Sequence, residues 1–250
     1  MPIRVTVWNE FYDDPRHPAI QELYPGGVQE YLASVLREEP DMAVTARHFY
    51  EDDACGLSDE VLDSTDVLLV YGHILRDNVP EDRVKKLIER VVKEGMGVIF
   101  LHSALWMNLF QRLVGPGAYC GYRELGERER VWVVNRNHPI AAGLPSSFVI
   151  PHTEVYSEPA GFPDPDELVF ISWYQGGEAA RSGMVWRRGA GRIFYFSPGH
   201  AWYNAMQIPE YHTVIKNAVR WAVPPSSPPP LNRSAELTPL EDIVLAGEDR

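Results

Sequence analysis

Two hydrophobic patterns alternate along the first 115 residues. Short strands are predicted at 3–8, 42–48, 67–71 and 97–101, and the run at 67–71 is apolar at successive positions, which is typical of a strand buried on both faces. Between these runs, apolar residues recur every three or four positions, which predicts helices over 26–36 and 80–95, besides a short one near 58–62. Residues 10–25 are expected to form an irregular connection. This alternation is typical of α/β proteins with right-handed crossovers and parallel strands.

The second half of the chain is richer in strand patterns than in helix patterns. A closing helix is predicted over 211–222, and strands are predicted at 130–135, 148–150, 167–173, 183–187 and 192–196. Together with the first half, they predict one α/β domain over residues 1–223. Its sheet is expected to be doubly wound and mostly parallel, with helices on both faces and additional strands from the second half.

The composition changes abruptly after Val223. Five prolines occur within residues 224–230, which is typical of a stiff, extended spacer. The remainder to Arg250 is acidic and has too few apolar residues to build a core. We therefore expect a Pro-rich acidic C-terminal tail over residues 224–250.

Charge and cysteine content exclude several classes of function. The formal net charge is -12, which disfavours nucleic acid as a partner. No apolar run approaches the roughly 20 residues needed to span a bilayer, and the first residues lack a secretory signal pattern, so neither a membrane partner nor export is expected. Cys55 and Cys120 are far apart and predict neither a disulfide framework nor a zinc ribbon. A cytoplasmic location is the expectation.

Polar side chains gather directly after the predicted strands. In an open α/β sheet, ligands bind beyond the carboxyl ends of the strands, so these residues are the first candidates for a site. They are Asn9, Glu10, His73, His102, Ser103 and His200. Three of the eight histidines of the chain are among them, which favours a shared site over isolated contacts to loop carbonyls.

Two further segments are candidates for the same edge of the sheet. Residues 151–156 are expected to form a connection that brings Glu154 and Tyr156 over it. The turn at His102-Ser103 is similar to a nucleophile elbow, although the flanking glycines are missing and Ser103 is equally suited to cap a helix. Aromatic rings near the strand ends can either stack on a sugar or pack in the core; they are Trp8, Tyr71, Trp173, Trp202 and Tyr203.

Several spaced motifs together resemble the ThuA-like (trehalose utilisation) family over roughly residues 3–223. They are Val7-Trp8-Asn9-Glu10, Tyr71-Gly72-His73, Gly97 to Ser103, Asn137-His138-Pro139-Ile140, Glu154-Val155-Tyr156 and Phe196-Ser197-Pro198-Gly199-His200. The resemblance implies a class I glutamine amidotransferase-like fold with a flavodoxin-like sheet. It also implies a role in the bacterial use of trehalose and related disaccharides.

The sequence departs from the amidotransferases at the positions that carry their chemistry. Those enzymes have a cysteine at the elbow and a His-x-Glu pair after a late strand, whereas this chain has His102-Ser103 and Gly199-His200-Ala201-Trp202. Without a thiolate and an orienting carboxylate, no glutaminase activity is expected. Ala201 also departs from members of the resembled family, which often have an acid directly after this Gly-His.

Two chemistries remain open for the predicted site. His73, His102, Glu154 and His200 have the side chains that bind a divalent metal such as Zn²⁺. Alternatively, His102, Glu154 and His200 act as catalytic acids and bases without a metal. In either case the substrate-binding residues are predicted to be Asn9, Glu10, His73, Ser103 and Tyr156.

The leading hypothesis is an isomerase- or lyase-like enzyme acting on a disaccharide or keto-sugar. A non-catalytic sugar-binding or regulatory module is the alternative that Ala201 favours. A serine hydrolase that uses Ser103 and His200 is a third hypothesis. The expected partners are a small-molecule sugar and further copies of the chain in a homo-oligomer.

Overall fold

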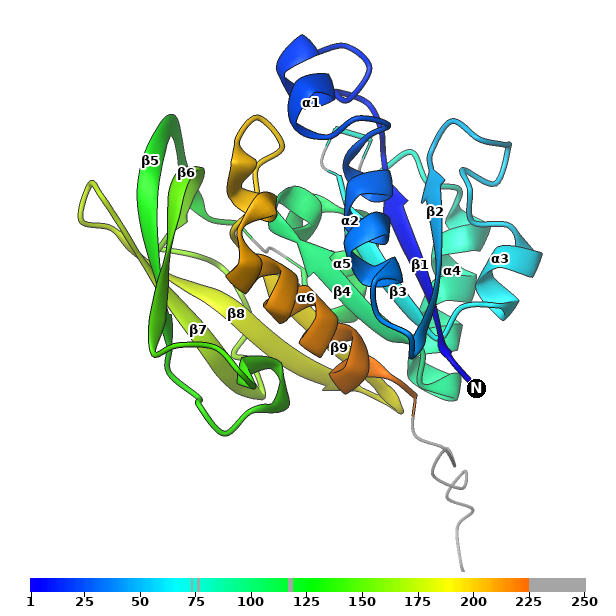
Figure 1. Cartoon of the computed structure of the whole chain (residues 1–250). Coiled ribbons are helices and arrows are strands. Elements are labelled where there is room, and N and C mark those ends of the chain that lie inside the picture. The colour runs from blue at the N-terminus through cyan, green and yellow to red at the C-terminus, as the bar shows by residue number, and fades with distance from the viewer. Residues whose placement is uncertain (73, 76, 117–118, 225–250) are drawn as a thin grey trace, which may run out of the picture.

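The computed structural model describes residues 1–224 except 73, 76 and 117–118 (Figure 1). Residues 225–250 lie outside the described residues, so the tail predicted over 224–250 stays a prediction. His73, one of the predicted metal and substrate ligands, also lies outside them. Among the helices within the described residues, none is both long enough and apolar enough to cross a bilayer.

Five parallel strands form one half of a nine-stranded sheet. Their order is β2-β1-β3-β4-β9, so the last strand of the chain lies next to β4. The predicted strands of the first half are all present, with almost the predicted limits. The bounds are β1 (Ile3–Asn9), β2 (Met42–His48), β3 (Val67–Tyr71), β4 (Gly97–Leu101) and β9 (Gly191–Phe196).

The other half of the sheet is antiparallel, and the prediction of a mostly parallel sheet was wrong. The sheet continues from β9 through β8 (Ala179–Arg188), β7 (Glu167–Tyr174), β5 (Gly121–Val133) and β6 (Ser147–Ser157), each antiparallel to its neighbours. The connections explain this. Only residues 175–178 join β7 to β8, and 189–190 join β8 to β9, which is too short for the crossover that parallel neighbours require.

Helices cover both faces of the parallel half, as predicted (Figure 1). The α2 (Val28–Arg37) and α6 (Pro209–Ala222) helices pack on one face, and α3 (Asp59–Asp63), α4 (Glu81–Glu89) and α5 (Asn108–Leu113) pack on the other. A π-helical turn (Arg90–Glu94) extends α4 to Gly95, whose left-handed φ of 85° is typical of the glycine that ends a helix. The α1 helix (Pro18–Leu23) was not predicted; its residue Ile20 is buried.

Three 3-10 turns complete the helical elements of the described residues. They are η2 (His102–Trp106), η3 (Pro139–Ala141) and η4 (Asn204–Gln207). The chain from His102 to Leu113 is not one continuous helix: Met107 has an extended backbone between η2 and α5.

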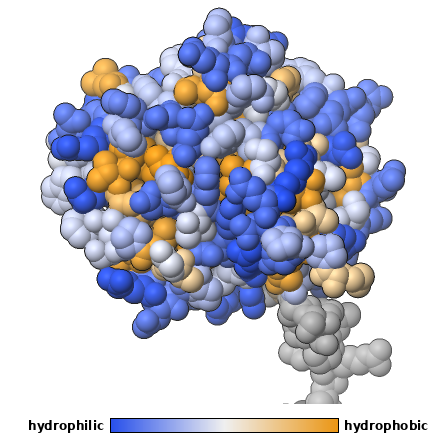
Figure 2. Space-filling view, viewed as in Figure 1, coloured by the Kyte–Doolittle hydropathy of each residue, from blue (hydrophilic) through white to orange (hydrophobic). Residues whose placement is uncertain are grey.

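Alternation along each parallel strand divides the core into two layers. Val5, Val7, Leu69 and Ile99 contact the cluster that includes α2 and α6, whereas their neighbours in sequence face α3, α4 and α5. Every residue of β3 and β4 is buried, which explains why their sequences are apolar without alternation. On the face seen in Figure 2, polar side chains separate the apolar areas.

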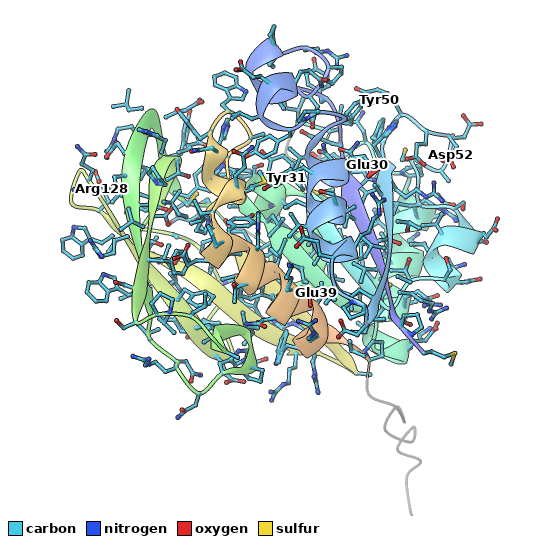
Figure 3. All side chains as sticks on the ribbon, viewed as in Figure 1. Glu30, Tyr31, Glu39, Tyr50, Asp52 and Arg128 are labelled. Carbon is cyan, nitrogen blue, oxygen red and sulfur yellow. The ribbon has the colours of Figure 1, made fainter. Side chains whose placement is uncertain are left out.

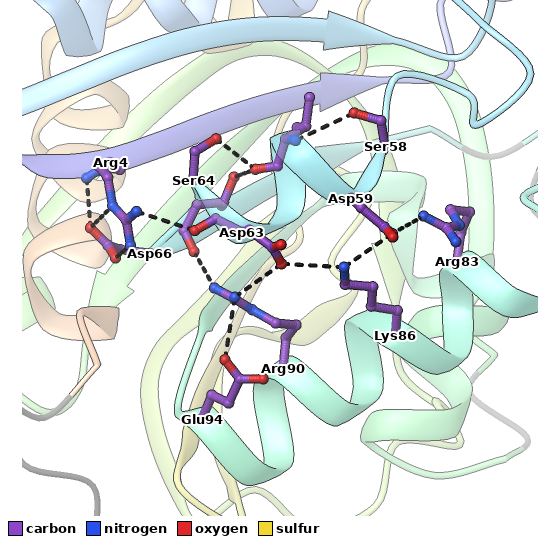
Figure 4. A network of polar contacts seen from close by, with 12 residues as sticks. Arg4, Ser58, Asp59, Asp63, Ser64, Asp66, Arg83, Lys86, Arg90 and Glu94 are labelled. Carbon is purple, nitrogen blue, oxygen red and sulfur yellow. Dashed lines mark hydrogen bonds and ion pairs between the residues drawn. The ribbon is translucent and has the colours of Figure 1, made fainter.

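Charged side chains link α3 to α4 on the surface (Figure 4). Asp59 pairs with Arg83 and with Lys86 at 3.0 Å, and Asp63 lies 3.2 Å from Lys86 and 3.5 Å from Arg90. Exposed pairs of this kind contribute at most about 1 kcal/mol each. They join neighbouring helices and lie outside the pocket described below.

The antiparallel half contains one fully buried carboxyl group, that of Glu129 on β5. Burial raises its pKa from 4.5 to about 7, and the nearby hydroxyls of Ser172 and Tyr174 offset this only in part. Neither carboxyl oxygen makes a well-formed hydrogen bond within the described residues. Glu129 is therefore protonated in the folded protein at pH values where it is already ionised in the unfolded chain.

This difference predicts a pH-dependent stability. Between pH 4.5 and about 7 the folded protein binds one proton more than the unfolded chain, so the free energy of unfolding falls as pH rises, by about 3 kcal/mol in total. Glu129→Gln should remove this component. Urea unfolding should therefore show the variant more stable than the native chain at pH 8 by an amount that shrinks towards pH 4.5. An equal difference at both pH values would contradict the prediction.

Candidate functional site

His102 lies at the strand-to-helix turn that follows β4. Its backbone φ is +48°, in the left-handed region that a nucleophile elbow uses to project one side chain. Of the pair His102-Ser103 that the sequence predicted at the elbow, His102 therefore occupies the elbow position. A non-glycine residue held in this conformation is worth attention as a functional candidate.

The imidazole of His102 is fully buried and held on three sides. Its Nδ1 lies 2.7 Å from the carbonyl oxygen of Ser197, which follows β9. Its ring stacks on that of Tyr156, with centroids 4.2 Å apart and planes 8° apart. Its Nε2 lies 3.0 Å from Oε2 of Glu154. The orientation of the ring is thus determined by three different segments of the chain.

Glu154 belongs to a strand and not to the connection that was predicted over 151–156. That expectation was wrong because β6 continues through Pro151 to Ser157, paired with β5. The β5–β6 pairing extends from Gly121, but β5 pairs with β7 only from Glu129 to Val133. The far part of the hairpin therefore leaves the plane of β7 and supplies Glu154 to His102 (Figure 1).

His200 completes a cluster of three side chains. Its Nε2 lies 3.6 Å from the same Oε2 of Glu154, and its ring stands at 87° to that of His102, with centroids 5.3 Å apart. One ligand atom from each of His102, Glu154 and His200 lies within 4.8 Å of the other two. Three of the four predicted metal ligands thus meet at one point; the fourth, His73, lies outside the described residues.

A proton or a cation must lie between His102 and Glu154. The Ser197 carbonyl can only accept, so Nδ1 of His102 carries a hydrogen and Nε2 has a free electron pair in the neutral ring. A carboxylate oxygen 3.0 Å from that electron pair would be repelled unless a proton or a metal ion bridges the two. The cluster is therefore suited to proton transfer or to metal binding.

The donor set suits a tetrahedral ion, and both separations from Glu154 to the imidazoles are close to the tetrahedral spacing. Bonds of about 2.0–2.1 Å to nitrogen or oxygen place neighbouring ligand atoms of tetrahedral zinc about 3.3 Å apart. The separations of 3.0 and 3.6 Å from Glu154 to the two imidazoles lie on either side of this value. The hydrogen bond from Nδ1 of His102 to a backbone carbonyl is also the usual support of a metal-bound histidine.

An open pocket with a volume of about 450 Å³ lies above the cluster. Its size falls in the range of small-molecule sites. The residues that line it are Asp13, Ile74, Ser103, Trp106, Tyr122, Glu124, Glu154, Tyr156, His200 and Trp202. The sequence-based prediction of site residues included Ser103, Glu154, Tyr156 and His200 among these.

Glu124 is the main titratable residue of the pocket wall that was missed. It comes from the part of β5 before Glu129, which is polar on both faces and was not predicted as a strand. Partial burial, and next the charge of Glu154, raise the pKa of Glu124. The only sequence signal was the alternating charge of residues 123–130, which indicates an exposed strand but no site.

Ser103 and Tyr156 reach the pocket in different ways. Ser103 is buried at the pocket wall, and its hydroxyl has no hydrogen-bond partner among the described residues. It therefore makes no nucleophile–base pair with His200, which a serine hydrolase requires. Tyr156 lines the pocket and supports the ring of His102.

The side chains of Asn9 and Glu10 form hydrogen bonds to neighbouring segments of the chain. The Asn9 amide donates to Asp14 at 3.0 Å and to Gln29 at 2.9 Å. The Glu10 carboxylate accepts from the backbone N–H groups of residues 74 and 75, at 3.0 and 2.8 Å. Both residues border a cavity beside His200 that has room for about one water molecule, and neither lines the open pocket.

The aromatic rings near the predicted strand ends lie in three places: in the core, at or beside the pocket, and on the outer face of the antiparallel half. Trp8 and Tyr71 are buried in the core, where the Trp8 indole donates to the carbonyl of Cys55. Trp202 lines the pocket and is 42% exposed. Tyr203 lies beside His200, with ring centroids 5.8 Å apart. Trp173 lies on the outer face of the antiparallel half, away from the pocket.

The two cysteines are buried and unpaired with each other. Burial, together with the charges of Glu154 and Glu158, raises the pKa of Cys120 to about 12. A thiol with this pKa is protonated near neutrality and is a poor nucleophile. Cys120 therefore does not replace the elbow cysteine of the glutamine amidotransferases.

Solved structures with this fold include both ThuA-like proteins and an amidotransferase. A protein described as ThuA-like from Parabacteroides merdae superposes with a TM-score of 0.69 at 16% identity, covering 89% of this chain and 90% of the other. A second protein described as ThuA-like, from Bacteroides uniformis, superposes with a TM-score of 0.63 at 19% identity, covering 88% of this chain and 91% of the other. A glutamine amidotransferase from Thermotoga maritima superposes with a TM-score of 0.50 at 13% identity, covering 87% of this chain and 90% of the other. These similarities establish an amidotransferase-like α/β fold.

Sequence comparison gives the family. No curated protein matches the chain. The family described as "ThuA: Trehalose utilisation" matches residues 4–222, which include all of the sheet except Ile3 of β1, and all three residues of the histidine–glutamate cluster. The chain therefore belongs to the ThuA trehalose-utilisation family.

Proposed function

We propose that the protein is an enzyme of carbohydrate catabolism that moves a proton next to the keto group of a disaccharide or other keto-sugar, with isomerase- or lyase-like chemistry. The observation that carries the proposal is the convergence of His102, Glu154 and His200 at the floor of an open pocket. Membership of the trehalose-utilisation family supports a sugar as the substrate. A volume of about 450 Å³ accommodates a mono- or disaccharide.

The three residues have different access to a substrate. Glu154 and His200 line the pocket, with side chains 8% and 14% exposed, so they can touch a bound sugar. We assign them the proton transfers: one removes the proton on the carbon beside the keto group, and the other protonates the carbonyl oxygen. His102 is fully buried and holds Glu154 in position.

A divalent metal such as Zn²⁺ at the cluster is the alternative form of the proposal, in which Glu154 and His200 are ligands and do not themselves transfer protons. Its ligands would be Nε2 of His102, a carboxylate oxygen of Glu154 and a ring nitrogen of His200, with His73 as a further candidate. A bound metal would polarise the keto group or hold vicinal hydroxyls of the sugar. The walls contributed by Trp106, Tyr122 and Trp202 would exclude water and stack on the sugar ring.

Ala201 favours a second candidate function, a sugar-binding module without catalysis. The acid that often follows Gly-His in the family is absent, so His200 has no adjacent carboxylate in the sequence. Glu154 compensates for this, since its carboxylate lies 3.6 Å from the His200 ring. We therefore prefer the enzyme, and the module remains a defined outcome of the activity test below.

Metal binding gives the first test. Purified protein should contain a divalent metal at near stoichiometry by elemental analysis, and the chelated protein should rebind one Zn²⁺ by calorimetry. Glu154→Gln and His200→Ala each remove one ligand and should weaken binding by about 100-fold or more, whereas Ser103→Ala should not. If the chelated protein takes up no Zn²⁺, the cluster is an acid–base site without a metal.

Turnover gives the second test. Keto-forms of trehalose, followed by NMR in D₂O, should exchange the proton beside the keto group and then yield an isomer or cleavage product. His200→Ala and Glu154→Gln should lower kcat by about 10²–10⁴-fold. Tyr50→Ala, on an exposed residue beside β2 (Figure 3), is the control and should be fully active. Binding of these sugars without exchange or product would establish the non-catalytic module instead.

A further inference from the structure

A second hollow lies on the outer face of the antiparallel half. Its volume is about 410 Å³, and the residues that line it are Arg128, Arg130, Trp132, Trp173, Tyr174 and Gln175. None of them lines the histidine pocket. The two hollows therefore have separate walls, even though β5 contributes to both.

The pairing of β5 with β7 places these side chains on one face. Arg128, Arg130 and Trp132 are at alternate positions of β5 and are all exposed, while Glu129 and Val131 between them are buried. Trp173 lies directly opposite Arg130 in the register, and the N–H of Gln175 donates to the carbonyl of Arg128. Figure 3 shows Arg128 on this side of the molecule, away from the helices that cover the parallel half.

Both indole rings in this hollow are accessible to solvent. Trp132 is 43% exposed and Trp173 is 57% exposed. Leaving large apolar rings in water forgoes the free energy of burying them, and neighbouring exposed rings commonly mark a binding surface. Because the rings alternate with polar side chains in a hollow of small-molecule size, the face suits a small amphipathic ligand better than an extended protein partner.

The guanidinium groups of Arg128 and Arg130 are not neutralised. Neither has a carboxylate partner among the residues that the structure describes. Other arginines of this half-sheet do: Arg123 pairs with Glu127 and Glu178, Arg181 with Glu158 and Arg187 with Glu167. Within the described part of the chain, the Arg130 guanidinium contacts the Ser147 hydroxyl, at 3.3 Å, and the ring of Trp132, at 5.8 Å. In a chain of net charge -12, two unpaired cations side by side favour an anionic ligand.

We propose that this hollow binds an anionic saccharide, a sugar ring that carries a phosphate or a carboxylate. The indoles of Trp132 and Trp173 stack on the C–H face of the ring, and the Gln175 amide bonds to hydroxyls. The guanidinium of Arg128 or Arg130 binds the anionic group through two parallel hydrogen bonds. Since no residue of the histidine–glutamate cluster takes part, this binding does not depend on the function proposed above.

The experiment is a titration of the full-length chain labelled with 5-fluorotryptophan, followed by ¹⁹F NMR. The probes are glucose 6-phosphate, glucuronate, neutral glucose and inorganic phosphate. Trp132→Phe and Trp173→Phe assign the two signals. Both signals should shift with at least one anionic sugar, and the comparison of the two identifies the anionic group. Trp173→Ala should weaken that binding by about tenfold or more, and Arg128→Gln with Arg130→Gln should abolish the preference over glucose.

Two controls separate this site from the histidine pocket. His200→Ala and Trp202→Phe should leave the titration unchanged, whatever their effect on turnover. The proposal is overturned if neither signal moves with any sugar up to about 10 mM, a concentration that detects even weak binding. It is also overturned if inorganic phosphate binds as tightly as the sugar phosphate. A dimer in sedimentation velocity that Trp173→Ala dissociates would instead make this face a protein interface.

Discussion

The contact between His102 and Glu154 is the constraint on which the site depends. An imidazole and a carboxylate, both nearly inaccessible to water, lie 3.0 Å apart. Burying an imidazole nitrogen or a carboxylate without a hydrogen-bond or ion partner would be costly, and each of these two groups supplies such a partner to the other. This contact joins the turn after β4 to the edge strand β6, and so connects the two halves of the sheet at the pocket.

The parallel half could be predicted from the sequence because its burial is simple. Val67–Tyr71 and Gly97–Leu101 are apolar on both faces since helices cover both, and the helices between them have regular apolar stripes. Parallel strands end at one edge, so the residues after them, including His102 and His200, could be expected to meet. The antiparallel strands were predicted in part but their direction was not, because direction depends on the shortness of the turns between them and not on the hydrophobic pattern of each strand.

The other side of the site could not be predicted in the same way. Pro151 and the polar residues around it suggested a connection, whereas the chain continues as an edge strand, where proline is tolerated. Glu124 belongs to a stretch exposed on both faces, which has no hydrophobic alternation to reveal a strand. The choice between His102 and Ser103 at the elbow depends on a backbone φ of +48°, which residue types alone do not determine.

The way in which the β5–β6 hairpin is attached has a consequence for how such proteins diverge. It is anchored to β7 only from Glu129 to Val133, and its free end contributes Tyr122 and Glu124 to the wall of the pocket. Substitutions at the exposed β5 positions of that end leave the packed core intact. Within one family, ligand preference can therefore drift through this hairpin while the two histidines and the scaffold beneath them are inherited unchanged.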